Sequence, residues 1–394
     1  MKSPLRILSC AVVATALPLT AQRSEAPSSE STILEATRVV LAAGEALDGE
    51  AARLAIRDGK VVAVGREIGA EMLGRSRRVR LPAGAIVVPG FVALNDQLDL
   101  GAELAESIHA FTPELRAADA FDPFDRVLPW RARSGVTGIV LAPASVNTFA
   151  GIASLVKWDG ERGRVAAADG YLKLALVDSS LSRERYPTSR MGAADLVRQA
   201  FADASDPLLG VGPEYAVLRE VKDQSRRVAI HASSHGELVG AIDLARELGL
   251  APVLLDAVEP DECIELLKGS SVTIALRPLD WGSRVALLEA PAKLASAGVR
   301  FSFAGTTGNA LRRSAALAIK HGLDRRTALD AITRIPAEQA GFGERLGTLR
   351  VGRDADFVVF DGDPTELTSR LLETWVDGRR VHSSRSESNQ ESIR

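Results

Sequence analysis

Residues 228–257 read VAIHASSHGELVGAIDLARELGLAPVLLDA and contain one complete unit of the pattern that decides the fold. The short run Val228–His231 precedes a stretch of helical length, Glu237–Leu248, and a second apolar run follows at 251–255. Strand, helix and strand in this order predict two parallel strands joined by a right-handed crossover. Similar apolar runs lie at 136–141, 171–177, 272–276 and 299–304.

About seven or eight such units in roughly 260 residues fit a (β/α)8 TIM-like barrel. The alternative is an open doubly wound sheet, which usually carries a glycine-rich phosphate-binding turn. The sequence contains no such turn. We therefore predict an α/β protein with a (β/α)8 TIM-like barrel over residues 86–344.

Sequence patterns typical of β hairpins flank the predicted barrel on both sides. At 51–65, two apolar runs are joined by Asp58-Gly59, a dipeptide that favours a tight hairpin turn. Three further β-like segments lie at 347–352, 354–360 and 374–382. We predict one small composite β domain from residues 35–85 and 345–382, followed by a disordered tail at 383–394.

The N-terminus has the features of a secretory signal peptide. Lys2 and Arg6 precede the apolar run 7–17, and small residues lead to a cleavage position near Ala21. We predict a signal peptide at 1–21, a linker at 22–34 and a mature protein that is periplasmic or secreted. The apolar run is shorter than the about 20 residues needed to span a bilayer, so we predict no transmembrane segment after signal removal.

Composition and charge narrow the range of partners. The chain has 394 residues, of which 46% are apolar and 25% charged, as in ordinary globular proteins. Its formal charge of -3 gives no electrostatic reason to expect nucleic acid or an anionic membrane as a partner. Cys10 would leave with the signal, so Cys263 would remain alone, without an intramolecular disulfide. We interpret Cys263 as a buried, small apolar residue.

Several motifs follow one another in the order of a known family. VVAVG (61–65) and IVVPGF (86–91) precede the predicted barrel, and LGTLRVGRDADFVVFDGDP (346–364) follows it. Within the barrel lie FDPF (121–124), SGVT (134–137), PTSRMG (187–192) and HASSH (231–235). In these motifs the chain resembles the amidohydrolase superfamily, and its imidazolonepropionase-like branch in particular, over about residues 35–382.

The resemblance implies a hydrolase of non-peptide carbon-nitrogen bonds that uses zinc or another divalent metal at the C-terminal mouth of the barrel. In the family, the ligands are a His-x-His pair on the first strand, a Lys or Glu on the fourth, a His on the fifth, a His on the sixth and an Asp on the eighth. Here the first pair falls on Asn95 and Gln97. Both histidines of that pair are therefore absent.

The remaining ligand positions are also depleted. His231 keeps the fifth-strand position, and the sixth-strand position falls on or beside Asp256. The eighth-strand run 301–307 contains no aspartate, while Asp178 follows the fourth-strand run where the branch has a carboxylate. A catalytic zinc needs three protein ligands of the His or carboxylate type. Without the metal, the pKa of the attacking water stays far above the value of about 7 that a bound zinc gives, a loss of roughly 12 kcal/mol of activation.

Two classes of function follow. The first is an exported barrel that has lost metal-dependent hydrolysis, binds no metal cofactor and acts as a non-catalytic or ligand-binding protein. The second is a hydrolase of cyclic amide or imidazolone type that uses His231 and Asp256 as catalytic candidates with an altered or reduced metal site. In both cases we predict a pocket at the barrel mouth lined by Asn95, Gln97, Asp178, His231 and Asp256. We expect a small-molecule ligand, and we leave open an active amidohydrolase relative or a second copy of the chain as partner.

Other polar residues have simpler interpretations. We interpret His235 as a helix cap or surface residue, and His109, His321 and His382 as structural or solvated side chains. Asp354 and Asp356 are expected to be turn and strand-entry residues. We do not expect calcium at Asn95, Asp96, Gln97 and Asp99, because alternate residues of a strand point to opposite sides and calcium needs about six to eight oxygen ligands.

Overall fold

The computed structural model describes residues 31–42, 44–69 and 76–384. The predicted signal peptide, most of the predicted linker and most of the predicted tail lie outside these residues. Within them, strand β1 already begins at Ser31, so the assignment of residues 31–34 to a linker is wrong. These four residues pair with β2 and β4 as part of the sheet.

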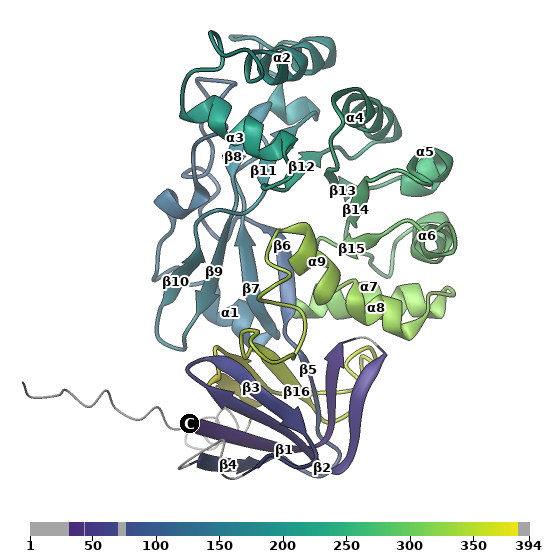
Figure 1. The fold of residues 1–394 in the computed structure, drawn as a ribbon. Helices are drawn as coiled ribbons and strands as arrows, with labels where there is room; N and C mark the ends of the chain where they lie inside the picture. The colour runs from purple at the N-terminus through teal and green to yellow at the C-terminus, as the bar shows by residue number, and fades with distance from the viewer. Residues whose placement is uncertain (1–30, 43, 70–75, 385–394) are drawn as a thin grey trace, which may run out of the picture.

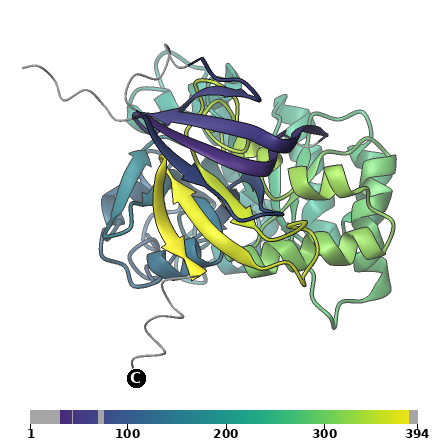
Figure 2. The ribbon, with the colours of Figure 1, turned by 90° about the horizontal axis from the view of Figure 1, so that it is seen from below.

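Both ends of the chain contribute to one sheet. It has the order β18-β17-β16-β5-β1-β2-β3, and β4 pairs in parallel with the first residues of β1, next to where β5 pairs with its later residues. Figure 2 shows the N-terminal and C-terminal strands side by side. The bounds are β1 Ser31–Ala42, β2 Glu45–Arg57, β3 Lys60–Gly65, β4 Ser76–Arg80, β5 Ile86–Pro89, β16 Phe357–Phe360, β17 Leu371–Val376 and β18 Arg379–Ser383.

Local sequence explains how this sheet forms. Asp58 and Gly59 have φ values of 52° and 75° in the turn between β2 and β3, as a two-residue hairpin loop with positive φ requires. Leu34, Leu54 and Phe357 are buried in one apolar cluster between the strands. Phe357 stacks on Trp375 with ring centroids 5.3 Å apart, which joins β16 to β17 through their side chains.

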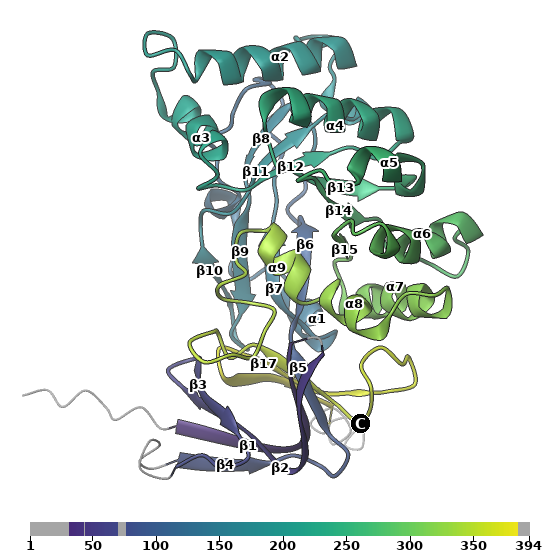
Figure 3. The same ribbon diagram turned by 45° about the vertical axis from the view of Figure 1, so that its right-hand side comes forward.

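The larger part of the molecule is a mixed α/β unit in which helices lie outside a curved set of strands (Figures 1 and 3). Strands β11 to β15 form parallel ladders in sequence order, and β6 pairs in parallel with β7. These strands are β6 Phe91–Asp96, β7 Val136–Leu141, β11 Leu172–Ala175, β12 Val228–His231, β13 Val253–Ala257, β14 Thr273–Leu276 and β15 Phe301–Phe303.

The helices connect these strands or follow the last one. The bounds are α1 Leu128–Arg133, α2 Arg190–Asp203, α3 Pro213–Lys222, α4 His235–Leu248, α5 Ile264–Leu267, α6 Val285–Ser296, α7 Gly308–Lys320, α8 Arg325–Asp330 and α9 Arg334–Gln339, with 3-10 turns η2 Ala117–Ala120, η3 Asp178–Ser180 and η4 Pro260–Cys263. Helix α4 begins at His235 with a capping box in which Ser234 is the N-cap and Glu237 bonds back to the cap backbone. Among the described residues, no helix is long and apolar enough to cross a membrane.

The prediction of a closed, all-parallel barrel is wrong in two respects. First, β8 (Phe149–Ile152) and β9 (Ser154–Trp158) run antiparallel to β11 and β7, and β10 (Gly163–Ala167) extends this sheet. A parallel neighbour of β7 would need a crossover connection, and residues 142–153 between β7 and its partner β9 contain β8 and no helix. The chain therefore turns back, and β8 and β9 link the two parallel groups.

Second, no strand ladder joins β15 to β6 in the described part of the chain. The segment between α8 and α9 lies there instead. The Phe303 N–H donates to the Ala331 carbonyl (3.1 Å), and the Val92 N–H donates to the Ile332 carbonyl (3.2 Å). Helix α9 contacts both β6 and β15 and covers the seam (Figure 3). These contacts satisfy edge groups that a closed ladder would otherwise pair.

The junction between β5 and β6 requires a glycine. A Cβ on Gly90 would lie 2.0 Å from Thr137 Oγ1, and the Gly90 N–H donates to the Asp356 carbonyl (3.0 Å). Only a residue without a side chain allows this close approach. The turn thereby passes the chain directly from the terminal sheet into β6, which carries Asn95 near its far end.

Candidate functional site

Polar side chains converge where β12 and β13 end. His231 is the last residue of β12, and its side chain is 18% exposed. The Ser145 hydroxyl lies 2.7 Å from His231 Nδ1, while Ser233 Oγ lies 3.3 Å from Nε2. Asp256 Oδ2 is 3.6 Å from the same Nε2. His231 therefore contacts a hydroxyl on one ring nitrogen and has a carboxylate near the other.

Asp256 is held in place mainly by Arg277, which follows β14. Arg277 Nε and Nη2 donate to Asp256 Oδ1 (3.1 Å) and Oδ2 (2.6 Å), a bidentate pair. Burial would raise the pKa of Asp256, but His231 and Arg277 lower it to about 2. The His231 contact is the longer one, so we assign most of this effect to Arg277. Asp256 also has φ = 64°, a left-handed conformation that costs energy for a non-glycine residue.

Lys173 lies on β11 and is 1% exposed. Its Nζ donates to Asn95 Oδ1 (3.1 Å) at the end of β6 and to the Pro143 carbonyl (2.6 Å). Burial lowers the pKa of Lys173 to about 7, and the attraction of Asp256 opposes this shift only in part. At neutral pH the amine is therefore divided between its charged and neutral forms.

The predicted site residues do not all meet. His231 and Asp256 lie together, and Asn95 joins them through Lys173. Gln97 follows β6 and is half-buried, and Asp178 is exposed at the start of η3. Within the described ranges, no side-chain hydrogen bond or ion pair connects Gln97 or Asp178 to His231 or Asp256.

The sequence analysis did not identify three residues that lie around His231 and Asp256, namely Lys173, Arg277 and Ser145. Lys173 had a signal, because it interrupts the apolar strand YLKLALV at the fourth-strand position where the resemblance calls for Lys or Glu. Arg277 and Ser145 had none, since each lies just after a strand whose position in the fold has to be known first. Asp96 pairs with Arg131, at 2.7 and 3.1 Å, and is not part of the group.

These residues do not fit the divalent metal that the resemblance implies. Both oxygens of Asp256 accept hydrogen bonds from Arg277, and the Asn95 oxygen accepts one from Lys173. The run that ends β15 continues as Ala304-Gly305 and offers no carboxylate. His231 is the one imidazole among the described residues of this group, whereas a catalytic zinc uses three protein ligands. Two basic side chains thus engage the oxygen donors that a metal would need.

A second cluster joins the terminal sheet to the larger unit. Oxygens of Asp354, Asp356 and Asp377 lie within 4.8 Å of one another. Lys157, on β9, places its Nζ 2.7 Å from Asp354, 2.7 Å from Asp356 and 2.8 Å from Asp377. Lys157 Nζ and Asp356 Oδ2 are close enough to form an ion pair. Their geometry does not make a hydrogen bond, and Asp356 Oδ2 has no other hydrogen-bond partner among the described residues. The lysine occupies the place that a cation would take.

Burial and charge act against each other in this second cluster. Burial would lower the pKa of Lys157, but the three carboxylates raise it above its ordinary value. Burial raises the pKa of Asp356 to about 6, against the attraction of Lys157. Burial would raise the pKa of Asp354 as well, yet Lys157 lowers it to about 2. Asp354 and Asp356 are thus part of an ion-pair network that connects two parts of the fold.

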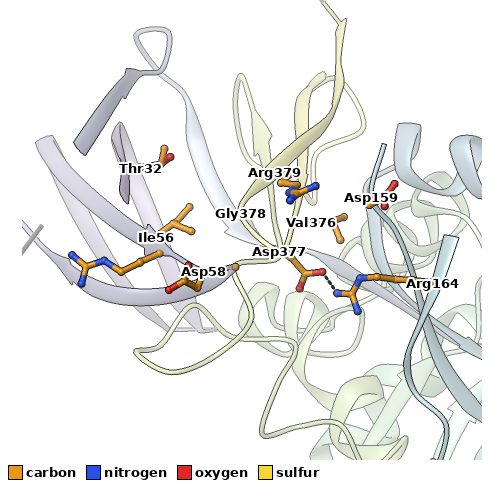
Figure 4. A pocket seen from close by; sticks show the side chains of 11 residues that line it. Thr32, Ile56, Asp58, Asp159, Arg164, Val376, Asp377, Gly378 and Arg379 are labelled. Atoms are coloured by element: carbon orange, nitrogen blue, oxygen red, sulfur yellow. Dashed lines mark hydrogen bonds and ion pairs between the residues drawn. The ribbon is translucent and has the colours of Figure 1, made fainter. Parts of the chain in front are cut away.

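Well-defined cavities occur away from the mouth. One of about 500 Å³ lies between β2, β18 and the β9–β10 hairpin, and Arg164 pairs with Asp377 at its wall (Figure 4). The other charged residues that line it are Arg57, Asp58, Asp159 and Arg379. Another of about 600 Å³ lies at the start of β11 and β12, and one of about 250 Å³ is lined by Glu103, Glu106 and Asp119. None of these three is lined by Asn95, His231 or Asp256.

The other singled-out residues have ordinary surroundings. His235 is the first residue of α4, with Nδ1 3.4 Å from Glu262 Oε2 and 3.5 Å from Cys263 Sγ. Cys263 is buried, and burial raises the pKa of its thiol to about 11, so it is a poor nucleophile at neutral pH. His321 is the C-cap of α7.

Parts of this chain are similar in sequence to known amidohydrolases. Residues 287–382 match the model of the Amidohydrolase family. Amidohydrolase tasK of Hapsidospora irregularis is 26% identical over 357 residues, which cover 75% of this chain and 35% of that protein. The chain therefore spans about a third of the length of this relative.

Solved structures share the fold. An amidohydrolase from Thermotoga maritima MSB8 superimposes with a TM-score of 0.77 and 23% identity, over 89% of this chain and 100% of that one. Guanine deaminase from C. acetobutylicum, with guanine bound in its active site, gives a TM-score of 0.54 and 14% identity over 90% and 100% of the two chains. At these identities the likeness establishes the fold.

Proposed function

We propose that the site around His231 binds a small molecule without a catalytic metal, in a chain whose residues 287–382 match the Amidohydrolase family model and whose fold is that of a solved amidohydrolase. In this proposal the protein has lost metal-dependent hydrolysis and acts as a non-catalytic or ligand-binding barrel. In this proposal the protein is related to hydrolases that act on carbon-nitrogen bonds but does not catalyse their metal-dependent reaction.

One observation carries the proposal. Arg277 binds both oxygens of Asp256, the carboxylate nearest to His231. Lys173 adds a second basic group beside Asn95. A divalent ion would have to displace one basic side chain and lie near another, at a cost that His231 and one carboxylate cannot offset. Compared with the metal site that the resemblance implies, this chain lacks most of the ligands. It also has Arg277 and Lys173, whose positive charges compete with a metal ion for the remaining oxygens.

Metal analysis tests the proposal. Protein purified without chelator should contain well under one equivalent of zinc, manganese or iron per chain, and it should not hydrolyse cyclic amides or imidazolones. The matched variant is Arg277→Gln, which frees Asp256 and should take up more zinc than the unchanged protein. A stoichiometric metal in the unchanged protein, lost together with turnover in His231→Ala, would refute the proposal.

A second candidate function is hydrolysis of carbon-nitrogen bonds without a resident metal. The observation that favours it is the 2.7 Å contact between the Ser145 hydroxyl and His231 Nδ1. A hydroxyl bonded to an imidazole is the arrangement that nucleophilic hydrolases use. Release of ammonia or amine from a panel of small amides, measured in the presence of a chelator, distinguishes this function from binding alone.

We also propose that the mature protein begins near Gln22 and is periplasmic or secreted. The support is the sequence of the first 21 residues, with its basic start, apolar run and small residues at the cleavage position. N-terminal sequencing of the protein from its native envelope or medium tests this directly. An intact Met1 in the cytoplasmic fraction would contradict it. An active relative or a second copy remains a proposed partner, to be tested by mass measurement of the native complex.

A further inference from the structure

We propose that Ser145 is a nucleophile for acyl transfer, with His231 as its general base and Asp256 as the residue that orients His231. The inference rests on the second candidate function and names its chemistry. The substrate class is a small ester or amide whose acyl carbonyl can reach the mouth beside His231. The reaction needs water and no metal.

The nucleophile and base are already in contact. Ser145 follows β7, is partly exposed, and its Oγ is 2.7 Å from His231 Nδ1. This is within the hydrogen-bond distance at which a base can accept the serine proton. Ser233 is the competing hydroxyl, but its Oγ is 3.3 Å from the other ring nitrogen. Ser145 is therefore the better placed of the two.

The carboxylate lies on the opposite side of the ring. With the imidazole proton on Nε2, Nδ1 is free to accept from Ser145, and Asp256 Oδ2 lies 3.6 Å from Nε2, beside Ser233 Oγ at 3.3 Å. The distance to Asp256 is longer than a hydrogen bond, but such contacts are often loose before a substrate binds. Arg277 holds Asp256 through both of its oxygens, and the backbone of Asp256 adopts a left-handed conformation at φ = 64°. Such strain persists where the surrounding structure fixes a side chain.

Buried donors without a partner lie in the same loop and in the segment that contacts it. Asn147, two residues after Ser145, is 1% exposed, and its Nδ2 has no acceptor among the described residues. Arg185 donates to the Val146 carbonyl (2.9 Å) and to Asn147 Oδ1, yet its buried Nη1 lacks a partner in the same part of the chain. Buried donors without acceptors are costly, and a ligand oxygen would satisfy them. Lys173 also bonds the carbonyl of Pro143, two residues before Ser145.

The chemical step balances without a further reagent. His231 Nδ1 takes the Ser145 proton as Oγ forms a bond to the acyl carbon. The leaving alcohol or amine takes that proton from His231 as its bond to carbon breaks, which leaves an acyl-serine. Water then gives a proton to His231 and attacks the acyl carbon. Ser145 recovers the proton, so ester or amide plus water becomes carboxylic acid plus alcohol or amine.

The test uses p-nitrophenyl acetate and the full-length mature chain in the presence of a chelator. A burst of nitrophenolate is expected, with an acetyl group on Ser145 located by peptide mass spectrometry. Ser145→Ala should abolish the adduct, and His231→Gln should slow its formation by at least about 100-fold. Ser296→Ala removes a hydroxyl that bonds only within α6 and should leave the rate unchanged. If Ser145→Ala does not fold, Ser145→Cys replaces it and should move the acetyl group to the new thiol.

The role of Asp256 is tested by a split between kinetic constants. Asp256→Asn should lower the acylation rate constant at saturating ester and leave the half-saturating concentration unchanged, whereas a purely structural role would alter both or lower the midpoint of unfolding. An adduct on Ser233 or a lysine, or no adduct at all, would overturn the inference. A stoichiometric metal would instead overturn the proposed metal-free mouth, whatever the outcome for Ser145.

Discussion

Two buried lysines in this molecule have opposite surroundings. Lys157 is 0% exposed and contacts three carboxylates, while Lys173 is 1% exposed and donates to two neutral oxygens. The pKa of Lys157 lies above its ordinary value, whereas that of Lys173 falls to about 7. Burial alone does not decide what a lysine does, because the charge of its partners determines whether it stays a fixed cation or becomes a group that titrates near neutrality.

The largest expected effect comes from removing the fixed cation. Lys157→Met leaves the buried Asp356 without its ion-pair partner, while Asp354 keeps Lys60 and Arg345 and Asp377 keeps Arg164. The loss of this buried cation should cost about 3–5 kcal/mol of unfolding free energy. Lys173→Met removes two hydrogen bonds but no ion pair, and should cost about 1–2 kcal/mol. Urea unfolding of both variants at pH 7 measures the difference. Equal losses would mean that the two lysines do not differ as described.

The next effect is the dependence of stability on pH. The pKa of Lys173 is about 7 in the folded protein and 10.5 for the unperturbed side chain. The unfolded chain therefore binds more protons between these values, so this group makes stability rise with pH by up to roughly 1.4 kcal/mol per pH unit in that window. Urea midpoints between pH 7 and 9 should show the rise, and Lys173→Met should flatten it.

Other buried groups titrate outside this window or oppose it. Asp356, with a pKa of about 6, makes stability fall as pH rises between about 4 and 6. Cys263, with its raised pKa of about 11, makes stability fall only above the ordinary thiol pKa of 9. The range from pH 7 to 9 therefore isolates Lys173. A flat profile there in the unchanged protein would contradict its lowered pKa.

A smaller change is expected when Lys173 is given a carboxylate partner, as Lys157 has. Asn95→Asp places a carboxylate at the position that accepts a hydrogen bond from Lys173 Nζ. The added charge should raise the pKa of Lys173 well above 7 and remove most of the stability gain between pH 7 and 9. Gln97→Asp is the matched control, since no hydrogen bond links Gln97 to Lys173 among the described residues. The Lys173 side-chain signal in an NMR titration measures the shift directly.

Only those parts of the fold and the site that rest on local patterns could be predicted from the sequence. The strands at 228–231 and 253–257 and the Asp58-Gly59 turn were predictable, since each rests on a local pattern. The antiparallel β8 and β9 were not, because their direction depends on the pairing of β8 with β11 and of β9 with β7, which is visible only in the folded chain. Lys173 carried a visible signal that the search for histidines passed over, while Asp178 was chosen for its place at a strand end and is exposed. Ion pairs such as Arg277 with Asp256 join separate strands, so they become visible only once the strands are placed.

The last prediction is that restoring two of the family's histidines changes neither metal content nor hydrolysis. Asn95→His combined with Gln97→His restores the first-strand pair of the family, yet it should give neither a stoichiometric metal nor hydrolysis of cyclic amides. Arg277 would still bind both oxygens of Asp256, Lys173 would still supply a basic group, and β15 would still end without a carboxylate. Zinc titration followed by calorimetry measures the affinity, and adding Arg277→Gln to the pair should increase it. If the double variant alone binds zinc tightly, then missing ligands, and not competing cations, explain the absence of a metal site.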